Sequence, residues 1–96
     1  MIWNNDIEGI DLGHGVRIVF TTWRRHERAG LLEEHTAPAG HRCGGGILFD
    51  LEGVREAFPD RPVWTVQQWD PLTLSPSLLC ECGHHGWIQN GKWVPA

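Results

Sequence analysis

The chain has 96 residues, which suits one small domain, so we expect a single domain over residues 1–96. Twelve acidic and eight basic residues give a formal net charge of −4, which argues against a general nucleic-acid binder because such proteins need a basic face. No apolar run reaches the roughly 18–20 residues of a membrane-spanning helix, and residues 1–6 do not resemble an export signal. We therefore expect a cytoplasmic protein, and in that reducing compartment three cysteines favour metal binding or free thiols over disulfides.

The first half of the chain predicts strands. Residues 16–23 are rich in β-branched and aromatic side chains, which is typical of a strand, and a polar, mostly basic turn follows over residues 24–28. Residues 29–36 are compatible with a short helix or a strand. We favour a strand because Gly30 and Pro38 would limit a helix to two turns.

The middle of the chain predicts a metal-binding type of turn. Residues 40–46 contain His41 and Cys43 followed by three glycines, which are free to adopt positive φ, so we expect a tight knuckle there. Residues 47–51 predict a buried strand. Residues 53–58 predict one helical turn, which the proline that follows would stop.

The last third of the chain predicts further strands and one hairpin. Residues 63–69 read as a strand, and residues 72–79 as an extended segment because Pro76 disfavours helix in the residue before it. Residues 87–94 contain Asn-Gly between apolar residues, the strongest short hairpin signal. The predicted fold class is therefore mostly β: a small antiparallel sheet with zinc-ribbon-like knuckles and at most one or two short helical turns.

Two pairs of potential metal ligands lie about forty residues apart. His41-x-Cys43 is the first pair, and Cys82-x-x-His85 is the second. Zinc is held tetrahedrally by four nitrogen and sulfur ligands in structural sites, and glycines beside both pairs would let the backbone fold over the ion. We therefore predict a structural Zn²⁺ ion at these four residues. Such a site contributes on the order of 10 kcal/mol of apparent binding free energy to folding.

Some choices within this site stay open. Cys80 is an alternative to any of the four ligands, and His84 is an alternative to His85. Cys80 and Cys82 are alternatively a strained local disulfide or a redox pair, and all three cysteines are alternatively small buried side chains. His35, like the other unassigned histidines His14 and His26, is expected to be an ordinary solvated residue. Zinc is favoured over iron or copper because a mixed histidine and cysteine set suits it.

Catalytic patterns are not recognisable in the sequence, so an enzyme is the less favoured interpretation. His26 begins no metalloprotease motif, and no zinc-deaminase motif occurs. Residues 44–46 lack the lysine and hydroxyl residue of a phosphate loop. Ser75, Ser77 and Glu81 form no recognisable triad. Four protein ligands would also close the metal site, whereas catalysis requires an open position.

The order of several motifs resembles a family of small, uncharacterised bacterial and phage domains. That family carries a His-x-Cys-x-Cys-Gly knuckle, a Thr-Leu-x-Pro-Ser segment and a Cys-x-x-His-x-Trp-Ile-x-x-Gly ending. The resemblance covers residues 29–96 and rests on residues 39–45, 64–66, 72–77 and 82–93.

The resemblance has consequences for the site and for the biological setting. The ligand candidates of the family fall on the four residues named above, and Gly45 stands where the family often has a second knuckle cysteine, which makes Cys80 a candidate substitute. Some members lie beside bacterial ubiquitin-like conjugation genes and others in phage genomes, where the location would be the host cytoplasm. The resemblance implies a metal-supported accessory domain.

Three functions follow from these observations. The favoured one is a zinc-binding accessory or protein-interaction domain with an unidentified protein partner or a second copy as a homodimer. Of the six tryptophans, we expect Trp3 or Trp23 at the interface. The alternative is a metal-dependent hydrolase or nucleotide-processing enzyme with water in the fourth zinc position. A third, less favoured, function is nucleic-acid contact through residues 23–28, whose positive charges nearby glutamates offset.

Overall fold

The computed structural model describes residues 9–96, and within that range the protein is mostly β, as predicted. The elements in chain order are β1 (Ile10–Gly13), β2 (Val16–Trp23), β3 (His26–Thr36), β4 (Arg42–Phe49), α1 (Val54–Ala57), β5 (Val63–Trp69), β6 (Leu72–Ser75), β7 (Leu78–Leu79), β8 (His85–Gln89) and β9 (Lys92–Pro95). No helix in this range is long and apolar enough to cross a membrane.

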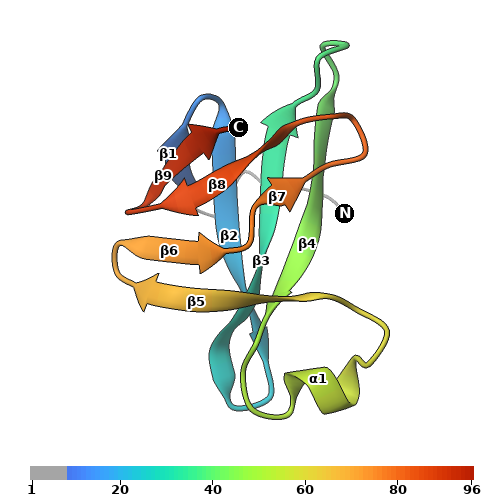
Figure 1. Cartoon of the computed structure of the whole chain (residues 1–96), viewed down its shortest axis with the longest axis vertical. Coiled ribbons are helices and arrows are strands. Elements are labelled where there is room, and N and C mark those ends of the chain that lie inside the picture. The colour runs from blue at the N-terminus through green and yellow to red at the C-terminus, as the bar shows by residue number, and fades with distance from the viewer. Residues whose placement is uncertain (1–8) are drawn as a thin grey trace.

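The strands form two sheets (Figure 1). The larger sheet has the strand order β1-β2-β3-β4-β5-β6, and the smaller has the order β7-β8-β9. All ladders are antiparallel except that of β4 with β5, which is parallel and contains only the pairs Leu48–Val63 and Phe49–Trp64. Residues 42–47 of β4 therefore pair with β3 on one edge and have no ladder partner among the described residues on the other.

The hydrophobic core lies between the two sheets. β8 packs against β6, and β9 packs against β1. Phe49, Leu31 and Ile88 are completely buried, and each such side chain contributes about 1.5–3 kcal/mol relative to exposure. The remaining members of the core are Leu12, Val16, Ile18, Leu72, Leu74, Leu78 and Trp93.

Most local predictions agree with the structure. Residues 29–36, which the sequence left ambiguous, belong to β3, and the predicted helical turn is α1. The Asn-Gly turn joins β8 to β9, with φ of 51° at Asn90 and 73° at Gly91. Positive φ at both central residues is the requirement of the predicted type of hairpin turn.

The tryptophans are distributed between core and surface. Trp93 is buried, whereas Trp69 keeps 39% of its surface exposed. Trp23 packs edge-on against Phe58, with ring centroids 5.5 Å apart. The predicted interface role of Trp3 falls outside the described residues.

The expected glycine knuckle is absent, and this prediction is corrected. The glycines at 44–46 lie inside β4 in extended conformation, and the positive φ of this region is at Gly40, 97°, in the turn before β4. The strand contains glycine because β3 and β4 approach very closely. A Cβ atom at Gly44 would overlap the carbonyl oxygen of Glu33, and one at Gly30 would overlap that of Ile47.

Candidate functional site

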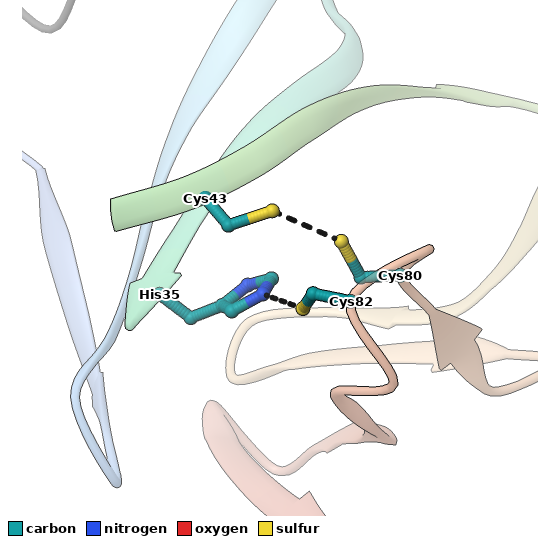
Figure 2. A group of neighbouring side chains, drawn as sticks. All are labelled: His35, Cys43, Cys80 and Cys82. Carbon is teal, nitrogen blue, oxygen red and sulfur yellow. Dashed lines mark hydrogen bonds between the residues drawn. The ribbon is translucent and has the colours of Figure 1, made fainter. Parts of the chain in front are cut away.

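Three cysteines and one histidine converge at one end of the β3–β4 ladder (Figure 2). His35 and Cys43 are register partners on β3 and β4, so their side chains emerge side by side on the same face. Cys80 and Cys82 come from the turn that joins β7 to β8. The ligand-type atoms of the four residues all lie within 4.8 Å of one another.

The donor atoms of this cluster suit a single tetrahedral metal ion. The Nε2 atom of His35 lies 3.2 Å from the Sγ atom of Cys82, and the Sγ atoms of Cys43 and Cys80 lie 3.3 Å apart. One imidazole nitrogen and three thiolates form a Cys₃His set, which is an established structural zinc combination. The cluster could therefore hold a metal ion, and the donor set favours zinc.

Glu33 orients the histidine of the cluster. Its carboxylate lies 2.6 Å from Nδ1 of His35. Both residues are buried, with 7% of Glu33 and 1% of His35 exposed. With the proton on Nδ1, this atom donates to Glu33 and leaves the lone pair of Nε2 facing the sulfur atoms. A carboxylate behind a metal-binding histidine fixes the tautomer and the ring orientation in this way. Burial raises the pKa of Glu33, and the hydrogen bond with His35 opposes that rise.

The thiols of Cys43 and Cys80 have pKa values shifted in opposite directions. The hydrogen bond with Cys80 raises the pKa of Cys43 to about 11. The pKa of Cys80 is lowered, first because the backbone N–H of Cys82 donates to its sulfur. Cys80 is thus the thiol that ionises more readily, and its sulfur is the acceptor when Cys43 donates the hydrogen bond between them. A metal ion would displace these protons, because thiolates are the binding form.

His84 forms a wall of the same site. Its ring stacks between His35, at a centroid distance of 3.9 Å, and Trp93, at 4.7 Å. Burial, followed by the nearby His35, lowers the pKa of His84. Glu33, His35 and His84 form a second group of neighbouring ligand-type atoms. The stack packs the turn between β7 and β8 against the buried Trp93.

The structure brings together two of the four residues that the sequence nominated as ligands. Cys43 and Cys82 belong to the cluster, and Cys80, left open as a substitute, joins them. His41 is exposed in the turn before β4, and neither His41 nor His85 belongs to a ligand group within residues 9–96. The expectation that His35 is solvated is wrong, since only 1% of this residue is exposed. His35 joins the cluster because the β3–β4 register pairs it with Cys43.

A serine and a histidine meet at the β7–β8 hairpin. Ser77 lies just before β7, and His85 begins β8. The Ser77 hydroxyl lies 2.9 Å from Nε2 of His85, within the range for a nucleophile and its general base. Trp64 holds the serine from β5, because its indole N–H donates to the Ser77 carbonyl over 3.3 Å. No carboxylate within residues 9–96 hydrogen-bonds to this histidine.

This pair was not predicted from the sequence, in which Ser77 belongs to no recognisable triad and His85 is a predicted metal ligand. Ser77 lies in the motif at 72–77 and His85 in the motif at 82–93, both of which carry the family resemblance. This location is the signal in the sequence that pointed to the two residues. Their contact depends on the ladder between β7 and β8, which the sequence analysis did not predict.

An open cavity of about 440 Å³ adjoins the cluster, and Ser77 and His85 do not line it themselves. Its walls come from β4 on one side and from β7 with the following turn on the other. The lining residues are Glu33, His35, Cys43, Gly44, Gly45, Gly46, Ile47, Trp64, Leu78, Leu79, Cys80, Glu81, His84 and Trp93. Two of the lining residues adjoin Ser77. Trp64 donates a hydrogen bond to the Ser77 carbonyl, and Leu78 follows Ser77 in the sequence.

Comparison with known proteins identifies one family. A family model described as "Bacterial ubiquitination-like system serine protease (BubE)" matches residues 21–96, which is most of the chain. No curated protein and no solved structure matches the chain.

Proposed function

The chain belongs to the family of bacterial ubiquitination-like system serine proteases (BubE), and on this premise we propose that it is a serine hydrolase in which Ser77 is the nucleophile and His85 the general base. The observation that carries the proposal is the distance of 2.9 Å between the serine hydroxyl and the imidazole Nε2. The family description, which names a serine protease, supports the proposal independently of this distance.

The chemistry follows from the two side chains. As the Ser77 hydroxyl attacks a carbonyl carbon, His85 Nε2 takes its proton and then gives that proton to the departing amine. Water cleaves the resulting acyl ester with the same histidine as base. The imidazole is held by its position at the start of β8, where Leu79 is its register partner, and by the Trp87 ring at 5.7 Å.

We propose a structural role for a metal ion at His35, Cys43, Cys80 and Cys82. Four protein donors leave no position for a substrate or a water molecule, so this set gives less support to the metal-dependent hydrolase suggested by the sequence. When bound, the ion would tie the turn between β7 and β8 to the end of the β3–β4 ladder. A metal ion held there would thus fix the hairpin that carries the proposed catalytic pair, and zinc is the ion that the donors favour.

The protein partner expected from the sequence is, in this proposal, a protein substrate of the ubiquitination-like system. A role in binding nucleic acid receives less support. Arg24 lies over the Trp23 ring at 4.7 Å, and Arg28 lies over Phe20 at 4.5 Å. Two of the three arginines of residues 23–28 therefore lie over aromatic rings of the chain itself, which gives this segment less support as a nucleic-acid site.

The test uses an active-site label. We expect a fluorophosphonate probe to modify Ser77, as located by mass spectrometry of the digested protein. The Ser77→Ala and His85→Ala variants should lose labelling while keeping one metal ion per chain, measured by elemental analysis. Ser75→Ala is the matched control, since this serine lies in the same segment without a histidine contact. Undiminished labelling of the Ser77→Ala protein would overturn the proposal.

A further inference from the structure

We propose that the cavity between β4 and β7 is the substrate subsite of this hydrolase, and that it receives an extended peptide segment with a large apolar side chain beside the bond to be cleaved. This inference rests on the proposed function, because it takes Ser77 as the attacking group. It adds the place where the substrate chain lies and the side-chain chemistry that is recognised.

The cavity reaches two residues that adjoin Ser77, although Ser77 itself does not line it. Leu78 follows Ser77 directly and lines the cavity, and Trp64 lines it while donating a hydrogen bond to the Ser77 carbonyl. A peptide whose carbonyl carbon is placed at the serine hydroxyl would therefore continue into this space on one side of the scissile bond. Substrate subsites of proteases commonly take this form, a concave surface next to the nucleophile.

The lining favours an apolar side chain. Ile47, Trp64, Leu78 and Trp93 form much of the wall, and Leu79 lies at the rim with 70% of its surface exposed. This is the greatest exposure among the large exposed hydrophobic residues of the described chain, and nothing in the core explains it. Contact with an apolar group of a substrate would bury it. Two acidic residues line the cavity, but neither places a free negative charge deep inside it. Glu33 is hydrogen-bonded to His35, and Glu81 is exposed.

The backbone around the cavity favours an extended chain. Residues 43–46 of β4 pair only with β3, and β7 pairs only with β8, within the part of the chain that the structure describes. Each of these strands thus retains one edge without a ladder partner. Extended peptides bind proteins by adding to such edges, where the main chain supplies affinity and pockets for alternate side chains supply specificity.

Gly45 offers a way to fill the cavity without disturbing the fold. It lines the cavity, its φ is not positive, and a Cβ atom built on it would meet no atom within 4 Å. A valine at this position would project into the space that the substrate occupies. The neighbouring Gly44 lacks this freedom, because its Cβ would overlap the backbone of Glu33.

The experiment measures cleavage of a library of internally quenched peptides by the metal-bound full chain and by its variants. We expect the parent protein to prefer peptides with a large apolar residue at one fixed position next to the cleaved bond. Gly45→Val should raise KM roughly tenfold with kcat changed by less than about twofold, since substrate binding is weakened and the catalytic pair is intact. Leu79→Ser should raise KM as well, by removing apolar contact with the substrate. Fluorophosphonate labelling of Ser77 should proceed at the parental rate in the Gly45→Val protein.

The matched control is Ile10→Ser, which replaces another exposed hydrophobic residue, 47% exposed, on β1 away from the cavity. If cleavage depends on Ser77 while Gly45→Val and Leu79→Ser behave like this control, the subsite proposal falls and the proposed function stands. The subsite proposal is equally overturned if the preferred residue is charged or if no position shows an apolar preference. If neither labelling nor cleavage depends on Ser77, both proposals fall together.

Discussion

Leu79 is the register partner of His85 in the ladder between β7 and β8, and that ladder contains only one other pair. Two residue pairs therefore hold the histidine at its distance from Ser77. So short a ladder is weak by itself, because isolated strand pairs are marginal in water. The turn that joins the two strands carries Cys80 and Cys82, so a metal ion held by the cluster would support the geometry of the proposed catalytic pair.

Removal of the metal should therefore abolish catalysis by releasing this turn. We expect one zinc ion per chain, and we expect chelation to destabilise the fold by up to about 10 kcal/mol, the scale of structural zinc binding. Thermal unfolding followed by circular dichroism, with and without a chelator, measures the loss. Hydrolysis that continues at the parental rate in fully metal-free protein would contradict the proposed coupling.

Substitution of single ligands should distinguish the cluster from the set nominated by the sequence. Cys80→Ser is expected to lower metal content below one ion per chain, because it removes one of four donors. His41→Ala should retain one ion, since His41 is exposed and belongs to no ligand group. Elemental analysis after dialysis gives both results. Loss of metal from the His41→Ala protein would favour the original set of His41, Cys43, Cys82 and His85.

Replacement of the carboxylate behind His35 should weaken the site without removing a ligand. Glu33→Gln keeps the shape of the side chain and loses its charge, so we expect zinc affinity to fall by about 10–100-fold. Competition with a chromogenic chelator measures the change. Glu34→Gln is the control, because that carboxylate binds Arg42 and makes no contact with the histidine ring. Equal affinities for the two variants would remove the orienting role assigned to Glu33.

The turn between β8 and β9 should be sensitive to any side chain at its second position. Gly91 has a φ of 73°, and a Cβ atom there would lie 3.1 Å from the Pro71 Cβ atom. We expect Gly91→Ala to lower the free energy of unfolding by roughly 1–2 kcal/mol, the usual cost of a left-handed conformation for a residue with a Cβ atom. Urea denaturation gives the value, and an unchanged midpoint would argue against the turn described here.

Local sequence signals predicted much of the fold. The strand at 16–23 and the hairpin around Asn90-Gly91 follow from side-chain type and from turn chemistry, which act over a few residues. The glycines of β4 misled the prediction, because their role is to admit the backbone of β3. That reason is visible only when the two strands are seen together.

The candidate site was predictable only in part for the same reason. Cys43 and Cys82 were found because close pairs of ligand-type residues leave a signal in the sequence. His35 has no such neighbour, and it joins the cluster through strand register alone. Ser77 and His85 are eight residues apart and meet across a two-pair ladder, which periodicity over so short a segment does not reveal.

The close approach of β3 and β4 has a consequence for mutational tolerance. Gly30 and Gly44 touch no donor atom and no reactive group, yet any larger residue at either position would force the two strands apart. His35 and Cys43 are register partners on those two strands, so such a separation would increase the distance between these two candidate ligands. A screen of random substitutions for inactive protein should recover these two glycines alongside the catalytic serine, although neither takes any part in the reaction.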